Sequence, residues 1–184
     1  MRIIIAAIVG GIVVFVWASV AHMLLPFGEM GLSTLPDETR FMESVKAVPS
    51  SGMYFFPGMS RAEDQKAWEE RIKSSPSGLL VVTKSGGGMT PQRLVSEFVS
   101  NVIAALIAAI LLSFMVGSWF KRAFAVALFG VFGIVSILVS YWIWYGFPIE
   151  FICGEAATEI IGWFLAGLVM AKLVRPPFPA IVPA

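Results

Sequence analysis

The sequence predicts a mainly α-helical protein: a bundle of four transmembrane helices, with a small α+β cap outside the cytoplasm between the first two. Three observations predict this fold, namely the composition, the length of the apolar runs and the placement of the charges. The 184 residues are 58% hydrophobic and only 14% charged, whereas soluble domains carry roughly 25% charged residues. Too few charges are therefore present to cover a soluble globule of this size.

Four apolar runs are long enough to cross a bilayer: residues 3–25, 97–119, 123–145 and 156–174. An α-helix rises about 1.5 Å per residue, so about 20 residues cross a hydrocarbon core of about 30 Å. We therefore expect four segments, which are a first transmembrane helix at 1–25, an α+β cap at 26–96, transmembrane helices 2–4 at 97–175 and a proline-rich cytoplasmic tail at 176–184.

The first apolar run also has features of a cleaved signal peptide. It follows a basic residue, Arg2, and contains a Ser19–Ala21 sequence that a signal peptidase could accept. Its apolar character nevertheless continues past that site through Met23–Leu25. This continuation favours an uncleaved membrane helix.

The charges that flank the apolar runs separate by sign. One set of helix ends carries only bases, which are Arg2, Lys121, Arg122, Lys172 and Arg175. The opposite ends carry only acids, which are Glu97, Glu150, Glu155 and Glu159. Basic residues near helix ends mark the cytoplasmic side of a membrane. The pattern therefore predicts that both termini are cytoplasmic and that the cap lies on the opposite side.

The cap is expected to contain two helices and two strands in alternation. Residues 37–48 follow Pro36 and begin with acids, and Ser60 with Glu63 matches a capping box that would open a second helix. The short apolar runs 52–58 and 78–84 are candidates for a paired minimal sheet.

Local signals also predict how the later helices begin and connect. Thr90 followed by Pro91 is a cap and a first-position proline, so the second membrane helix should begin there. Lys121–Arg122 is expected to be a tight turn between the second and third helices. The four prolines of the tail predict an extended segment.

Each predicted membrane helix carries a stripe of small and polar residues at helical spacing. Such stripes mark faces that meet other helices, because membrane helices pack through small residues. The four stripes are Ala7, Gly11, Ala18 and His22; Glu97, Asn101, Ala105 and Ala108; Gly130, Gly133, Ser136 and Ser140; and Glu155, Glu159, Gly162 and Ala166. Their polar members lie at the outer ends. The sequence therefore predicts a buried polar cluster in the outer half of the bundle, made of His22, Glu97, Asn101, Ser140, Glu155 and Glu159.

Several interpretations of this cluster stay open. His22, Glu97 and Glu155 are near enough to the interface to be simply solvated, and the two glutamates also fit a first helical turn. Glu159 lies one turn deeper, and its repulsion with Glu155 requires a proton on one of them or a cation between them. Glu159 is thus either a neutral acid hydrogen-bonded to Asn101 or His22 across the bundle, or a proton or cation site.

The sequence predicts neither a metal nor a cofactor. A histidine with several carboxylates can bind a divalent metal, but the spacing is not diagnostic and the Glu-x-x-His signature of di-iron bundles is absent. The single cysteine, Cys153, excludes an intrachain disulfide and has no basic neighbour to activate it. A net charge of +1 argues against a nucleic-acid partner. Because no nucleophile elbow, zincin motif or P-loop is present, a non-enzymatic role is favoured.

Four sequence features carry a resemblance. They are Trp17, the His22–Pro26 sequence, the Leu35–Glu38 helix start and the Gly52–Gly58 segment with its Tyr54 and Pro57. With them the chain resembles a group of small uncharacterised bacterial inner-membrane proteins with four transmembrane helices. The resemblance implies a bacterial inner-membrane setting and no catalytic activity.

These observations lead to one functional expectation and two alternatives. We expect a non-enzymatic accessory or scaffold subunit of a larger bacterial inner-membrane complex, whose partners are membrane lipids and other membrane protein subunits. The first alternative is a membrane protein with its own outward-facing proton, cation or small-ligand site, serving transport or sensing. The second is a membrane enzyme that uses the outer polar cluster.

Overall fold

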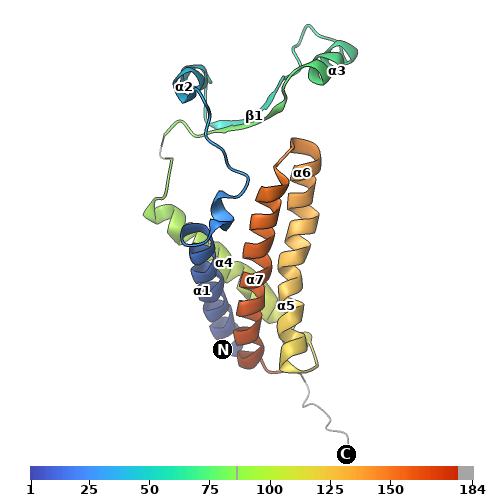
Figure 1. The fold of residues 1–184 in the computed structure, drawn as a ribbon. Coiled ribbons are helices and arrows are strands. Elements are labelled where there is room, and N and C mark those ends of the chain that lie inside the picture. The colour runs from blue at the N-terminus through green and yellow to red at the C-terminus, as the bar shows by residue number, and fades with distance from the viewer. Residues whose placement is uncertain (86, 178–184) are drawn as a thin grey trace, which may run out of the picture. The chain divides into compact units, whose positions relative to one another are not determined.

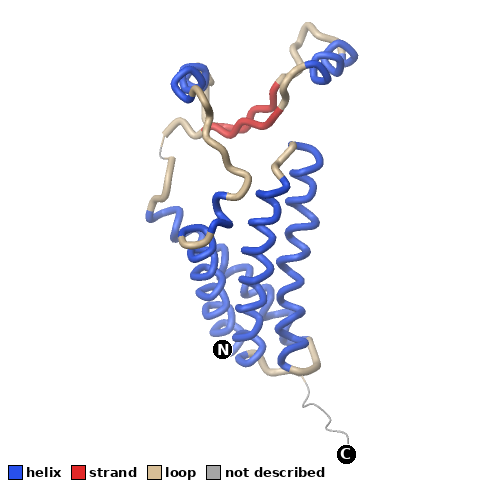
Figure 2. Tube along the Cα trace, viewed as in Figure 1, coloured by secondary structure: helices blue, strands red, loops and turns tan. Residues whose placement is uncertain are grey.

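The computed structural model describes residues 1–85 and 87–177, so most of the predicted tail lies outside the described residues. The described part is mainly helical and contains one two-stranded sheet (Figures 1 and 2). The elements are α1 (Arg2–Met23), the 3₁₀ helix η1 (Pro26–Glu29), α2 (Glu38–Lys46), β1 (Gly52–Phe56), α3 (Gln65–Ser74), β2 (Gly78–Val82), α4 (Pro91–Phe114), α5 (Trp119–Gly133), the π-helical segment η2 (Ile134–Leu138), α6 (Val139–Tyr145) and α7 (Ile149–Leu173).

Four helices in the described residues are long and apolar enough to cross a membrane. They are Arg2–Met23, Pro91–Phe114, Trp119–Tyr145 and Ile149–Leu173. The third is continuous through α5, η2 and α6. The prediction of four apolar helices of membrane length is thus confirmed.

The chain divides into two compact units. The first, which we call the bundle unit, contains the four long helices and η1. The second, the cap unit, contains α2, β1, α3 and β2 within Ser33–Met89, and Trp144–Gly146 is grouped with it.

Within the bundle unit, α7 is the central helix. It packs against α1 on one side and α5 on the other, and α1 in turn packs against α4 (Figure 1). The core between them is built from small and aliphatic side chains, including Ala105, Ala166 and Met170. Small residues at these contacts let the helices approach closely.

Two glycines show how close this approach is. A Cβ atom on Gly11 would lie 2.8 Å from Cα of Val102 on α4. A Cβ atom on Gly130 would lie 2.9 Å from the backbone of Glu159 on α7. Both neighbours are backbone atoms of packed helices, so a larger residue at either position forces the helices apart.

The membrane-length helices begin and end differently from the apolar runs. The Thr90 side chain accepts a hydrogen bond from the backbone N–H of Arg93 at 3.3 Å, and Pro91 is the first helical residue, as predicted. The helix ends at Phe114, five residues before the predicted end at 119, because the chain turns at Gly117 with φ +132°. Only glycine adopts this backbone conformation without strain.

The predicted turn at Lys121–Arg122 is therefore wrong. Both residues lie in the first turns of α5, whose N-terminus is capped by Ser118. The last long helix also begins earlier than expected, at Ile149 after Pro148, rather than at 156. A proline sets the start of this helix, whereas the apolar-run criterion excluded the acids that follow it.

The small-residue stripe predicted on the third helix is correct only in part. Gly130 is buried against α7, but a Cβ atom on Gly133 would meet nothing within 4 Å, and Ser136 is exposed. For Ser136 the reason is the π-helical turn from Ile134 to Leu138, which changes the angular spacing of side chains after Gly133. Ser136 donates its hydroxyl hydrogen to the carbonyl of Phe132 at 2.6 Å instead of meeting another helix.

The cap unit has the predicted order of helix, strand, helix and strand. β1 and β2 pair antiparallel, with Tyr54 opposite Leu80. Helix α2 is capped by Asp37, which accepts from the N–H of Arg40 at 3.0 Å. Trp68 of α3 donates its indole N–H to the carbonyl of Pro57 at 2.9 Å, which ties the helix to the end of β1.

The start of α3 differs from the prediction. Its cap is Asp64, which accepts from the N–H of Ala67 at 2.8 Å, and not Ser60. The Glu63 carboxylate still accepts from the N–H of Ser60 at 3.3 Å, but this bond closes a turn before the helix. Glu63 also receives two hydrogen bonds from Arg71, at 2.9 and 2.6 Å. The capping-box pattern thus marked a turn at residues 60–63, whereas the helix begins at Gln65.

Candidate functional site

One pairing of titratable groups joins two helices of the bundle unit, between His22 and Glu155. His22 is in the last turn of α1 and Glu155 is in the second turn of α7. The imidazole Nε2 lies 4.0 Å from Oε1 of the carboxylate. The two side chains are 41% and 24% exposed, respectively, so the pair is reachable from outside the bundle.

The connection after α1 holds this pair in place. η1 folds back so that Gly28 lies against the histidine, and a Cβ atom there would be 2.5 Å from Nδ1. Gly31, with φ +73°, lies against the backbone N of Phe151 on α7. The His22–Pro26 sequence therefore ends α1 and begins a short clasp that packs on both α1 and α7.

Glu159 lies one turn along α7 from Glu155 and is half-buried. Its Oε2 accepts a hydrogen bond from the indole N–H of Trp163 at 2.9 Å. Asn101 and His22 were the expected hydrogen-bond partners of Glu159 across the bundle. The structure instead pairs Glu159 with Trp163, four residues further along the same helix. Glu159 is nevertheless within electrostatic range of Glu155, Glu97 and His22.

The remaining members of the predicted cluster are less closely joined. Asn101, half-buried on α4, donates its amide to the Glu97 carboxylate at 3.3 Å, a contact within one helix. Glu97 is exposed. Neither Glu97 nor Glu155 lies in a first helical turn, because their helices begin six residues earlier. Ser140 is half-buried on α6 and makes no hydrogen bond with the other five. The structure therefore brings His22, Glu155 and Glu159 together, with Glu97 and Asn101 at the edge.

Sequence reasoning missed two residues that support the cluster. Trp17 on α1 donates its indole N–H to the carbonyl of Thr158 on α7 at 2.9 Å. The buried Thr158 hydroxyl donates to the carbonyl of Gly154 at 3.0 Å. A Cβ atom on Gly162 would lie 2.9 Å from the Trp17 ring. The spacing of Gly154, Thr158 and Gly162 at four residues was the available signal for this contact face.

The cluster combines one imidazole on α1 with two carboxylates on α7. Residues 1–85 and 87–177 contain no group of three or more His, Cys, Asp or Glu side chains placed to hold a metal ion.

A second unexpected residue lies at the other end of the bundle. Arg122 is 2% exposed and donates to the carbonyls of Ala171 and Val174 on α7 at 3.1 and 2.9 Å, and of Leu112 on α4 at 2.9 Å. These carbonyls belong to the last turns of two helices, where backbone acceptors lack partners within the helix. Arg122 therefore joins three helices by capping two C-termini. The Nε of Arg122 makes no hydrogen bond. Among the described residues, it is the only buried side-chain nitrogen or oxygen atom without one.

Comparison with known proteins adds no family to this description. No family model matches the chain, and no match was found among curated proteins or solved structures. The fold and composition define a helical protein with four helices of membrane length.

Proposed function

We propose that the protein is a non-enzymatic accessory or scaffold subunit of a larger bacterial inner-membrane complex. In this proposal the four long helices span the inner membrane, both termini are cytoplasmic and the cap unit is periplasmic. The charge separation between the helix ends supports this orientation.

One observation carries the accessory role: the third long helix has an open glycine, Gly133, near an apolar groove, and the chain's own helices do not fill the space at that glycine. A Cβ atom on Gly133 meets nothing within 4 Å, whereas Gly130, one turn earlier, is packed against α7. One turn before Gly133, Phe129 lines an apolar groove of about 360 Å³ together with Ala125, Leu128 and Phe132. A glycine beside a groove permits close approach by another membrane helix. The adjoining π-helical segment, η2, is a feature that recurs at functional sites.

Two matched glycine variants test this proposal. Gly133→Leu should fold like the parent, because space is open there, but should fail to co-purify with the protein's membrane partners in mild detergent. Gly130→Leu is the control that should lose stability instead, because its side chain meets the α7 backbone. If Gly133→Leu retains every partner in parental amount, or if the parent purifies alone, the proposal is wrong.

The His22–Glu155–Glu159 group supports a second candidate, an outward-facing proton or cation site. It is favoured by the 4.0 Å separation of His22 and Glu155 and by the half-buried carboxylate one turn away. Ionisable groups inside membrane segments usually have a function.

Reconstitution in proteoliposomes with an internal pH dye separates this candidate from the scaffold. Under an imposed potential the parent should move protons, whereas Glu159→Gln should not, because glutamine keeps the hydrogen bond from Trp163 but cannot titrate. Glu29→Gln, an exposed acid in η1, is the control. Equal traces for parent, variants and empty liposomes would eliminate the transport form of this candidate.

A further inference from the structure

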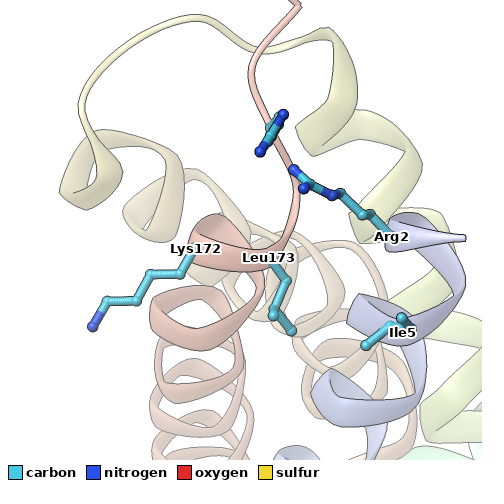
Figure 3. Close-up of a pocket in the computed structure, with 5 residues that line it drawn as sticks. Arg2, Ile5, Lys172 and Leu173 are labelled. Atoms are coloured by element: carbon cyan, nitrogen blue, oxygen red, sulfur yellow. The ribbon is translucent and has the colours of Figure 1, made fainter.

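A pocket of about 470 Å³ lies where α1 begins and α7 ends (Figure 3). It is lined by Arg2, Ile5, Lys172, Leu173 and Arg175. Two chain segments far apart in sequence therefore meet to form it, and both belong to the bundle unit.

Two guanidinium groups supply the charge of this pocket. Arg2 and Arg175 are exposed, and the ion pairs found among the described residues lie elsewhere, at His22–Glu155 and Arg71–Glu63. Lys172 contributes its stem rather than its charge, because its ammonium lies 4.7 Å from the centre of the Trp119 ring on α5. In Figure 3 the Lys172 side chain extends away from Arg2 and Ile5. Among the described residues, no acid lines the pocket beside these cations.

The position of Arg175 is determined by the bundle itself. The preceding residue, Val174, is 2% exposed, and its carbonyl accepts from Arg122 at 2.9 Å. This bond holds the end of α7, and with it the backbone from which Arg175 extends.

The pocket combines these two cations with aliphatic side chains. Ile5 is 45% exposed, and Leu173 is half-buried beside it. Arginine forks bind phosphate oxygens in pairs. Basic pockets between membrane helices on the cytoplasmic side bind the head groups of anionic lipids. A free phosphate would use the guanidinium groups but leave the aliphatic part of the pocket unused.

We propose that this pocket binds the phosphate head group of an anionic phospholipid, with Arg2 and Arg175 on the phosphate and Ile5 and Leu173 against the start of the acyl chains. The inference relies on the membrane placement of the proposed function but not on the accessory role. Purified protein is sufficient to test it, so its failure is distinguishable from a failure to find partners.

The test is native mass spectrometry of the full-length protein in detergent, titrated with phosphatidylglycerol or with phosphatidylethanolamine. The parent should bind phosphatidylglycerol with clear preference. Arg2→Gln and Arg175→Gln should each weaken that binding roughly fivefold, and the double variant roughly 30-fold. Lys121→Gln removes one charge from an exposed residue at the same end of the bundle and is the matched control, expected to bind like the parent. Circular dichroism checks that each variant is folded. If the double variant does not fold, the two single variants are sufficient to test the proposal.

Three outcomes would overturn the proposal. Equal weakening by Lys121→Gln would show a diffuse surface charge instead of a site. Equal affinity for phosphatidylethanolamine would remove the requirement for an anionic lipid. Competition by inorganic phosphate or glycerol 3-phosphate at the concentration of the lipid would identify a soluble anion as the ligand.

Discussion

Replacement of Arg122 by methionine should destabilise the bundle unit, because it removes the residue that joins three helices. The guanidinium donates to Leu112 at 2.9 Å, to Ala171 at 3.1 Å and to Val174 at 2.9 Å. Methionine fills a similar volume but donates no hydrogen bond. Three carbonyls at the ends of α4 and α7 would then lose their partner.

The magnitude follows from these three bonds. Hydrogen bonds between membrane helices contribute on average about 0.6 kcal/mol and at most about 1.7 kcal/mol. Three of them correspond to about 2–5 kcal/mol, and the charge on the donor favours the upper part of that range. The methionine variant also avoids the desolvation cost of burying a charged guanidinium, and this gain offsets part of the loss of hydrogen bonds. We therefore expect a decrease of about 2–3 kcal/mol in the free energy of unfolding.

The assay is unfolding of the detergent-solubilised protein by sodium dodecyl sulfate, followed by far-ultraviolet circular dichroism. Arg122→Lys should be intermediate, because a single ammonium cannot reach three carbonyls on two helices in a fork geometry. Lys121→Met changes the exposed neighbour on the same helix and should leave stability unchanged. Parental stability for Arg122→Met would refute the reasoning, since it would mean that the carbonyls find other partners or that desolvation cancels the bonds.

Two further predictions concern the cap unit and the α1–α4 contact. The hydrogen bond from Arg71 lowers the pKa of Glu63 below its ordinary value of 4.5, so the pair stabilises the cap above that value and the stabilisation disappears as the pH falls through the lowered pKa. Hydrogen exchange of the α3 amides in the parent and in Arg71→Met should therefore differ at about pH 6, and the difference should shrink as the pH falls below 4.5, whereas a constant difference would contradict this origin. Gly11→Leu should lower the free energy of unfolding by about 1–3 kcal/mol in the dodecyl sulfate assay, because its side chain meets the Val102 backbone. An unchanged value would mean that α1 and α4 do not pack as described.

Features that depend on local chemistry could be predicted from the sequence. Thr90 and Pro91 predicted the start of α4 because a cap and a first-position proline act within one turn. The pairing of β1 with β2 followed from two short apolar runs flanked by turn residues. The four membrane-length helices followed from run length alone.

Features that depend on which helices meet could not be predicted in the same way. Two adjacent bases at Lys121–Arg122 look like a solvated turn, and only the convergence of the α4 and α7 ends explains why Arg122 is buried. Gly130 and Gly133 are alike in sequence, but only Gly130 faces α7. The π-helical turn that follows Gly133 leaves no composition signal either, because it depends on the register of backbone hydrogen bonds.

The candidate cluster contains one feature that the sequence predicts and one that depends on tertiary structure. The spacing of Glu155 and Glu159 correctly placed two carboxylates one turn apart on α7. The approach of His22 to Glu155 additionally needs the clasp formed by η1, in which Gly28 lies against the imidazole. That clasp is a tertiary feature, so a helix-by-helix interpretation placed Ser140 in the cluster on equal terms with His22.

The placement of the four helices across a membrane is the central claim, and cysteine accessibility in intact bacteria tests it most directly. In a Cys153→Ala background, Ser77→Cys probes the cap unit and Val116→Cys probes the connection between α4 and α5; both positions are exposed. A thiol reagent that cannot cross the inner membrane should label Ser77→Cys in intact cells with a permeabilised outer membrane. It should label Val116→Cys only after the inner membrane is broken. Labelling of both sites in intact cells, or of Val116→Cys alone, would contradict the topology on which the proposed function depends.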